Sequence, residues 1–475
     1  MTLLAKEVPV KCVLLLSMLL LGGHAWSDVP LPPTPAGTIF GEWLAVFNAA
    51  DARQVQAFNE RHPRHLNSVE NMVKASQRSG GMAVLRIEQS EPLRIVVLLQ
   101  EKQTERALRA EFTASGAESP EFQRLDIKPT DLPPDLAPPR MSQAESLQAV
   151  IARADQLAKQ DRVSGAILIA RDNKVLLEKA WGQANRETGA AATTETQFRL
   201  GSLNKMFTAT AVLQLVEAGK LSLQDPIGKY FSDYPNKEVA SKVTVRHLLT
   251  HTGGTGDIFG PEFDANRLNL KEHADYVRLF GARALAFEPG SEDRYSNYGF
   301  VLLGVLIEKI SGQSYYDFVR ERIFQPAGMH SADSLPEDVD VPRRAAGYRR
   351  DGDSWKSNAS KLPYRGMAAG GGYSTIGDIW RFAQALQSGK LLSKATLAEA
   401  TRPQNNKQWY GYGFTLLGAN EIRSYGHGGG APGMNADLRI YPELGYVLIS
   451  LSNLDPPAAS MLVDYYALRM PLSSI

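Results

Sequence analysis

The sequence predicts a small α+β domain at residues 28–128, followed by a larger mixed α/β domain at 141–475 built on an antiparallel sheet. Three observations predict this division. A chain of 475 residues is longer than one ordinary domain. Residues 129–140 (PTDLPPDLAPPR) contain five prolines, which is typical of a semi-rigid linker. In the larger part, strand-like runs occur near both ends with helices and loops between them, so one sheet would combine strands from both ends of the sequence.

The N-terminal residues 1–27 have the layout of a secretory signal peptide. Two lysines precede an apolar run at residues 12–21, and residues 25–27 (AWS) form a small-x-small cleavage site. The run is too short to span a bilayer comfortably, and an uncleaved anchor is the alternative. Cys12, the only cysteine, lies inside this segment, so the mature chain would have no thiol for disulfides, catalysis or zinc binding. We therefore expect a periplasmic or extracellular protein without a stable membrane span after cleavage.

The charge balance excludes one class of function. The chain has 52 Lys and Arg against 51 Asp and Glu, and 43% of its residues are hydrophobic, as in an ordinary globular protein. No basic run forms a patch of the kind that binds nucleic acid, so we predict no nucleic-acid partner.

The first domain is predicted from one helix and three strands. Residues 39–62 have apolar spacings near three and four, and strand-like runs follow at 82–87, 93–100 and 107–114. A helix followed by an antiparallel meander is an α+β pattern, and it resembles the nuclear-transport-factor-like or cystatin-like fold. No constellation of catalytic residues occurs in this domain.

The larger domain is predicted to begin with a helix at 144–160. Two strands follow at 165–171 and 174–179, joined by a turn at Asp172-Asn173. The elements expected at the C-terminal end are strands at 412–417, 423–426, 435–441 and 446–452 and a helix at 457–468.

The segment at residues 198–223 (FRLGSLNKMFTATAVLQLVEAGKLSL) carries the main chemical signal. We expect a helix from Ser202 onward, capped by Gly219, so Ser202 and Lys205 would lie one turn apart on the same face. A serine hydroxyl needs a nearby base, and a lysine can act as one when burial or neighbouring charge lowers its pKa. The helix N-terminus also favours negative charge developing at the serine. The residues expected on the buried face are Phe207, Val212, Leu215 and Val216.

A Ser-x-x-Lys match alone is weak, because an N-cap serine with a surface lysine gives the same pattern. The whole segment, however, resembles the active-serine segment of class C β-lactamases and D-alanyl-D-alanine carboxypeptidases, within the penicillin-binding-protein-like superfamily that also contains esterases. The resemblance covers about residues 145–455. It implies a β-lactamase/transpeptidase-like three-layer sandwich, with an antiparallel sheet and a helical subdomain, and acyl transfer through Ser202 without a cofactor or a metal.

Residues 295–297 (YSN) match the Tyr-x-Asn motif of the same superfamily. The resemblance implies that Tyr295 and Lys205 share proton transfer, either with a tyrosinate or with a tyrosine paired with Lys205. The pKa of free tyrosine is near 10 and would have to fall, so an adjacent cation is required. Asn297 would hold Lys205 and the substrate amide by hydrogen bonds.

His427, followed by Gly428 and Gly429, matches the Lys-Thr-Gly or His-x-Gly motif of the family, which lies on a sheet strand beside the serine. The resemblance implies that His427 orients the substrate, that Gly429 lets the strand approach it, and that the N–H groups of Gly430 and Ser202 form the oxyanion hole. A free histidine is mostly neutral at pH 7, which weakens the positive charge that the β-lactamase lysine supplies to a substrate carboxylate.

Two further patterns match a metal site and a dinucleotide-binding site, but the residues around them do not support either function. His247 and His251 are four residues apart, as in a metal pair, but no third ligand is evident. The glycines at 428, 430 and 433 match a dinucleotide fingerprint, but no strand–helix–strand unit surrounds them.

Three hypotheses of function remain open. The first is an esterase or D-amino-acid peptidase acting on a small ester, amide or D-peptide. The second is a β-lactamase or D-alanyl-D-alanine carboxypeptidase, and His427 counts modestly against the β-lactamase branch. The third is a catalytically weak module that binds a ligand, which the presence of all the expected catalytic residues disfavours.

Overall fold

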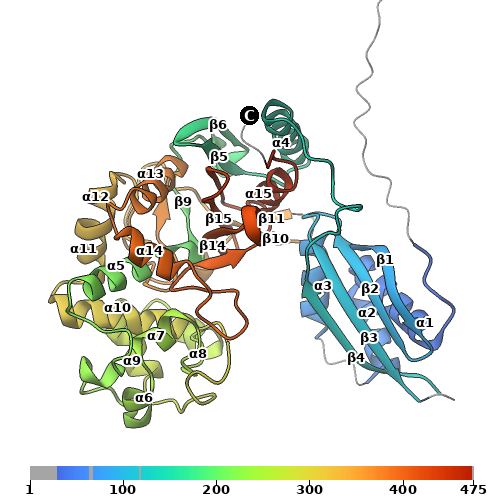
Figure 1. The fold of residues 1–475 in the computed structure, drawn as a ribbon, viewed down its shortest axis with the longest axis horizontal. Coiled ribbons are helices and arrows are strands. Elements are labelled where there is room, and N and C mark those ends of the chain that lie inside the picture. Colours follow the sequence, from blue (N-terminus) through green and yellow to red (C-terminus); the bar gives the residue numbers. More distant parts are fainter. Residues whose placement is uncertain (1–28, 64–67, 117–118, 353, 473–475) are drawn as a thin grey trace, which may run out of the picture.

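The computed structural model describes residues 29–63, 68–116, 119–352 and 354–472. The predicted signal peptide lies outside these residues. Within them, the helices are all too short or too polar to cross a membrane. The described chain forms a smaller unit, coloured blue to cyan in Figure 1, beside a larger unit coloured green to red.

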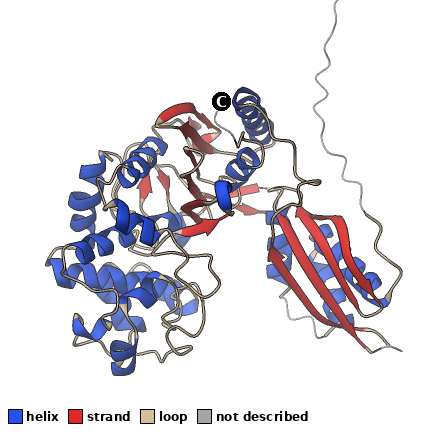
Figure 2. Ribbon diagram, viewed as in Figure 1, coloured by secondary structure: helices blue, strands red, loops and turns tan. Residues whose placement is uncertain are grey.

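The smaller unit is a four-stranded antiparallel sheet with helices packed on one face (Figure 2). The side chains of Ile95, Val97 and Leu99 point to this face, where they share a core with Phe40 and Trp43. The elements of this unit are α1 (Pro35–Ala49), α2 (Ala52–Arg61), α3 (Val69–Ser79), β1 (Met82–Glu91), β2 (Arg94–Glu101), β3 (Ala107–Ser115) and β4 (Glu121–Pro129), with the strands in this order.

The smaller unit differs from the sequence prediction in three elements. The single helix expected at 39–62 is two helices, because Ala50 adopts a left-handed φ of 51° and the Asp51 side chain caps α2 by accepting from the Gln54 N–H. The apolar spacing continues across this break and conceals it. Helix α3 and strand β4 were not predicted, since charged and polar residues make up much of both segments.

A six-stranded antiparallel sheet forms the centre of the larger unit, in the order β13-β14-β15-β16-β5-β6. This order confirms that strands from both ends of the sequence join in one sheet. The turn residues Asp172 and Asn173 both have positive φ, as a tight hairpin requires. The strands are β5 (Gly165–Arg171), β6 (Lys174–Trp181), β13 (Thr415–Leu417), β14 (Ser424–Ala431), β15 (Met434–Tyr441) and β16 (Tyr446–Ser452).

Two strand boundaries of this sheet were predicted wrongly. Strand β13 begins at Thr415 rather than at 412, because Gly413 has a φ of 79° and crosses helix α5 (Lys205–Glu217) closely. A Cβ on Gly413 would lie 2.2 Å from the Cβ of Ala209. Strand β14 continues past Gly426 to Ala431, because its glycines keep the backbone ladder to β15.

Helices cover both faces of the sheet, which gives the three layers that the resemblance implied. On one face, Ile167 and Ile169 pack with α4 (Gln143–Lys159) and α15 (Ser460–Ala467). On the other face, Ala166 and Leu168 join the large core of the helical part. The elements of that part are α5 (Lys205–Glu217), α6 (Lys237–Lys242), α7 (Val245–Leu249), α8 (Pro261–Asn266), α9 (His273–Phe280), α10 (Asn297–Ser311), α11 (Tyr315–Val319), α12 (Gln325–Ala327), α13 (Ile376–Gln387) and α14 (Lys394–Ala400), with short strands β7 (Gln183–Asn185), β8 (Ala190–Ala191), β9 (Phe198–Arg199), β10 (Tyr348–Asp351), β11 (Ser354–Ser357) and β12 (Tyr373–Ser374).

Helix α5 does not have the one-sided buried face that the sequence suggested. Every residue from Lys205 to Leu213 is buried, so the helix runs through the centre of the helical part. Ser202 precedes α5 in a 3₁₀ turn, Gly201–Asn204. The expected cap is present, since Gly219 follows the helix with a left-handed φ of 67°.

Candidate active site

The turn that carries Ser202 is pressed against strand β14. Gly201 has a φ of 55°, and a Cβ on it would lie 2.9 Å from the backbone nitrogen of Gly430. On the strand side, a Cβ on Gly429 would lie 1.8 Å from the carbonyl oxygen of Leu200. Both glycines are therefore needed for this contact, which places the backbone amide of Gly430 beside the serine turn. Ser202 itself is partly exposed.

Lys205 is completely buried behind the serine. Its Nζ lies 3.2 Å from the Oγ of Ser202 and donates to the Oδ1 of Asn297 at 2.7 Å and to the carbonyl oxygen of Ala369. Burial lowers the pKa of Lys205 from 10.5 to about 7, against the opposing charge of Asp257. About half of these lysines are therefore neutral at pH 7 and able to accept a proton.

Tyr295 completes a triad with these two residues. Its ring centre lies 4.8 Å from the Nζ of Lys205, and its hydroxyl lies close enough to Ser202 for the serine to lower the pKa of Tyr295. Burial raises the pKa of Tyr295 above its ordinary value, and the nearby Ser202 offsets only part of this effect. The sequence left two forms of Tyr295 open, a tyrosinate and a neutral tyrosine paired with Lys205. The raised pKa disfavours the tyrosinate, and a neutral tyrosine beside Lys205 fits the geometry.

Asn297, the first residue of α10, is held in one orientation by an acid that the sequence reasoning missed. The side chain and backbone N–H groups of Asn297 each donate to the carboxylate of Asp257 at 3.1 Å. The side-chain oxygen is then left to accept from Lys205. Asp257 is exposed, in a loop with no spacing pattern that could have linked it to the site.

His427 lies on β14, and both of its ring nitrogens are hydrogen-bonded within the protein. It is buried, with Nδ1 2.5 Å from the carbonyl oxygen of Gly428 and Nε2 2.8 Å from the hydroxyl of Tyr410. Burial and, to a smaller extent, the charge of Lys205 lower the pKa of His427 to about 3. The neutral ring therefore donates from Nδ1 and accepts from Tyr410. Tyr410, which lies in a loop before β13, was also missed from the sequence.

The remaining histidine pair has no metal-binding geometry. The Nδ1 of His247 accepts from the N–H of Thr244 at the start of α7, and the Nδ1 of His251 accepts from the N–H of Ser296. Across the described parts of the chain, no three His, Cys, Asp or Glu side chains are grouped as a metal site.

Comparisons with known proteins identify the family of the larger unit. The sequence model of a family described as Beta-lactamase matches residues 147–470. Penicillin-binding protein 4* of Bacillus subtilis is 32% identical over 323 residues, covering 63% of this chain and 70% of that protein. Esterase EstB of Burkholderia gladioli is 29% identical over 322 residues, covering 58% of this chain and 80% of the esterase. The crystal structure of D-amino acid amidase from Ochrobactrum anthropi SV3, complexed with L-phenylalanine, superimposes with a TM-score of 0.56 at 25% identity, covering 67% of this chain and 97% of the amidase.

Proposed function

This chain belongs to the β-lactamase family of serine hydrolases, and on that premise we propose that it cleaves an ester or amide bond through an acyl-enzyme on Ser202. One observation carries the proposal. The buried amine of Lys205 lies 3.2 Å from the Oγ of Ser202, and its pKa is near neutrality. A serine beside such a base is activated for nucleophilic attack.

In the first step, the neutral amine of Lys205 takes the proton of Ser202 as Oγ attacks the substrate carbonyl. A bond forms between Oγ and the carbonyl carbon, and the carbonyl oxygen gains the negative charge. The backbone N–H groups of Ser202 and Gly430 would stabilise this oxyanion. Collapse of the intermediate expels the alcohol or amine, which takes the proton held by Lys205 through Tyr295, a neighbour of both Ser202 and Lys205.

In the second step, water attacks the acyl-enzyme and the same groups act in reverse. Lys205 and Tyr295 take a proton from the water, and Oγ leaves with a proton as the acid product is released. Asn297, fixed by Asp257, keeps the Nζ of Lys205 aligned in both steps.

The substrate class proposed is a small ester, amide or D-amino-acid peptide. Support comes from relatives named as an esterase and a D-aminopeptidase, and from the D-amino acid amidase structure. The contacts among Ser202, Lys205 and Asn297 argue against a module that only binds ligand, because a binding site has no need of a buried lysine at near-neutral pKa.

Labelling with a fluorophosphonate tests the proposal. Intact mass should show a single adduct on the wild-type chain and none on Ser202→Ala. A screen of esters, amides, D-peptides and β-lactams on the same two proteins then identifies the substrate class. An unlabelled wild-type protein, or hydrolysis that persists in Ser202→Ala, would contradict the proposed function.

A further inference from the structure

The smaller unit is tied to the larger one by two ion pairs at the turn between β2 and β3. Arg469 donates from Nη1 and Nη2 to the carboxylate of Glu105, at 2.8 and 3.3 Å. The Nε of Arg106 donates to Asp464, in α15, at 2.9 Å. In Figure 1, α15 lies on the side of the larger unit that faces the smaller one. The side chains of Asp464 and Arg469 are only 10% and 9% exposed, so loss of a partner would leave a largely buried charge, and these contacts hold the smaller unit against α15.

Arg106 also completes a charge network inside the larger unit. The second carboxylate oxygen of Asp464 lies 2.5 Å from Arg439 on β15, and Arg439 also pairs with Asp437 at 2.8 Å. Asp437 and Arg439 are both buried. Within the larger unit these two acids share Arg439, and Arg106 of the smaller unit adds a second cation. The attachment of α15 to the sheet therefore depends on a charge that the smaller unit supplies.

The other end of α15 is bonded to the strand beside the serine through Asn435. The backbone N–H groups of Ala459 and Ser460 donate to the Oδ1 of Asn435 at 2.8 and 3.2 Å. The Nδ2 of Asn435, which is buried on β15, donates to the carbonyl oxygen of Gly429 at 2.8 Å. The backbone donors require an oxygen and the carbonyl requires a donor, so one orientation of the amide satisfies all three bonds. Asn435 therefore joins the first turn of α15 to β14.

The bond to Gly429 sets the direction of the neighbouring amide. The carbonyl of Gly429 and the N–H of Gly430 belong to one planar trans peptide group, so they point in opposite directions. Holding the carbonyl toward Asn435 turns the N–H of Gly430 away from it, and the contact with Gly201 places this nitrogen beside the serine turn. Glycine has no side chain that could anchor the strand here, so the neighbouring contacts decide the angle of this peptide.

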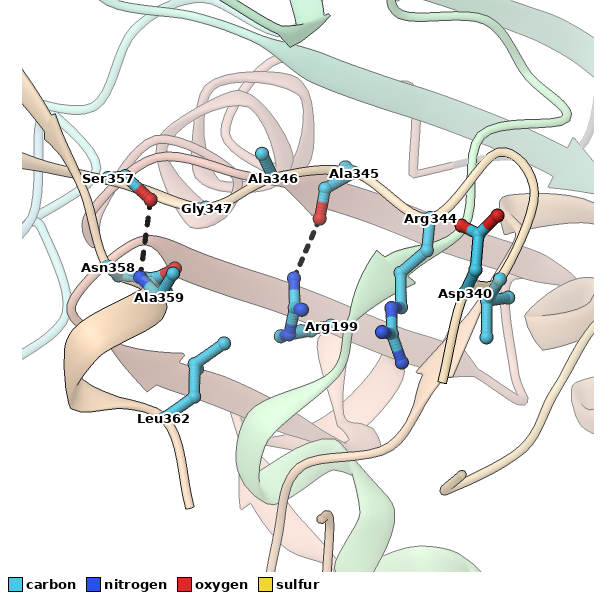
Figure 3. Close-up of a pocket in the computed structure, with 11 residues that line it drawn as sticks. Arg199, Asp340, Arg344, Ala345, Ala346, Gly347, Ser357, Asn358, Ala359 and Leu362 are labelled. Atoms are coloured by element: carbon cyan, nitrogen blue, oxygen red, sulfur yellow. Dashed lines mark hydrogen bonds between the residues drawn. The ribbon is translucent and has the colours of Figure 1, made fainter. Parts of the chain in front are cut away.

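The rest of the β14–β15 hairpin is anchored without α15. The backbone ladder to β15 runs from Tyr425 to Ala431. At the turn, the Nδ2 of Asn358 donates to the carbonyl oxygen of Pro432 at 2.8 Å, and Asn358 lies in the wall of a cavity of about 210 Å³ shown in Figure 3. These contacts keep the hairpin in place when α15 shifts, so we expect one peptide to tilt while the strand remains paired.

We propose that the smaller unit positions the oxyanion hole, with α15 as the connecting element and Asn435 as the positioning residue at its end. The inference rests on the proposed function of Ser202 and gives the smaller unit a role in it. Without the ion pairs of Glu105 and Arg106, α15 is free to shift, and the N–H of Gly430 loses its alignment with the developing oxyanion. Such a donor acts on the transition state, so the chemical step slows while binding changes little.

Inactivation of the full chain by a fluorophosphonate tests this without knowledge of the substrate. The phosphoryl oxygen takes the place of the oxyanion as Ser202 attacks, so kinact reports the alignment of the hole and KI reports binding. Glu105→Gln with Arg106→Gln should lower kinact about tenfold and keep KI within about threefold of the wild type. The control combines Glu88→Gln with Arg109→Gln, an ion pair at 2.6 Å within the smaller sheet, and should leave both constants unchanged.

Asn435→Asp tests the connecting residue. The new carboxylate keeps an acceptor for the first turn of α15 but cannot donate to the carbonyl of Gly429. The value of kinact should fall about tenfold or more, again with little change in KI. Because both sets of changes act through one connection, adding the Glu105 and Arg106 substitutions to Asn435→Asp should lower kinact by less than about twofold more.

The outcomes separate this inference from the proposed function. A kinact within about twofold of the wild type in the Glu105→Gln and Arg106→Gln variant, folded by circular dichroism, would overturn the inference, as would multiplicative losses in the combined variant. If the substitutions at Glu105 and Arg106 unfold the chain, an unchanged kinact in Asn435→Asp overturns it instead. A wild-type protein that is not labelled, or labelling of Ser202→Ala, would contradict the proposed function itself.

Discussion

The pH dependence of acylation follows from the burial of Lys205. A lysine with its ordinary pKa of 10.5 is neutral in about one molecule in three thousand at pH 7, whereas a lysine with a pKa of about 7 is neutral in about half. Burial therefore raises the concentration of the active base about 10³-fold at this pH. Because the deprotonated amine is the active form, activity should rise with pH, about tenfold per pH unit below 7, and reach a plateau above about 8.

The assay is kcat/KM for a neutral ester from pH 5 to pH 9, with the rate of fluorophosphonate inactivation as a second readout of the same base. Lys205→Arg is the matched control, because a guanidinium remains charged over this whole range. It should lose at least about 10²-fold in rate at every pH, as should Lys205→Ala. A wild-type profile that is flat from pH 5 to pH 8, or a near-normal rate in either variant, would refute Lys205 as the base and leave Tyr295 to act alone.

Further outcomes are expected from the other residues of the site. Ser202→Ala should abolish turnover and keep the wild-type melting temperature, measured by circular dichroism; a lowered melting temperature would point to a structural role. Tyr295→Phe should lower kcat about 10²-fold while the rise of activity with pH keeps its midpoint near pH 7, because that midpoint is set by Lys205. A midpoint that moves by a full pH unit would contradict the assignment of Lys205 as the base and Tyr295 as the residue that passes on the proton. Gly429→Ala places a Cβ 1.8 Å from a carbonyl oxygen and should lose most activity and about 1–3 kcal/mol of unfolding free energy, whereas Gly428→Ala, whose Cβ meets its nearest atom at 3.7 Å, should be tolerated. Equal effects of the two alanines on chemical denaturation would refute the close-contact argument.

The sequence predicted those parts of the site that depend on short spacing. Ser202 and Lys205 are three residues apart, so one turn of helix brings them together in any fold. The strands at the two ends of the larger unit were also readable, because β5 and β16 are continuous runs rich in apolar and β-branched residues. These are local signals, and the tertiary structure preserved them.

The residues that were missed act through tertiary contacts. Asp257 reaches Asn297 across 40 positions of sequence, and Tyr410 reaches His427 across 17, from loops without a repeating pattern. The surroundings of His427 could not be predicted for the same reason, since a free histidine and one hydrogen-bonded to Tyr410 have the same letter in the sequence. Only the folded structure shows that both ring nitrogens of His427 are hydrogen-bonded, one to the carbonyl of Gly428 and the other to the hydroxyl of Tyr410.

The same distinction explains why Ser-x-x-Lys is ambiguous in a sequence and specific in a structure. Helical spacing places an amine near a hydroxyl, but an exposed lysine at that position would keep its ordinary pKa and remain protonated. The base is created by burial among segments far from the motif, because desolvation lowers the pKa of Lys205. Asn297 at the start of α10 and the carbonyl of Ala369 accept hydrogen bonds from Nζ, and the ring of Phe300 lies 5.4 Å from it. Catalytic strength in this chain is therefore a property of the packed helical part, and substitutions that loosen the packing around Phe300 should raise the pKa of Lys205 before they unfold the protein. A destabilised Phe300→Ala variant whose activity still rises with pH around a midpoint near 7 would contradict this link between packing and the pKa of Lys205.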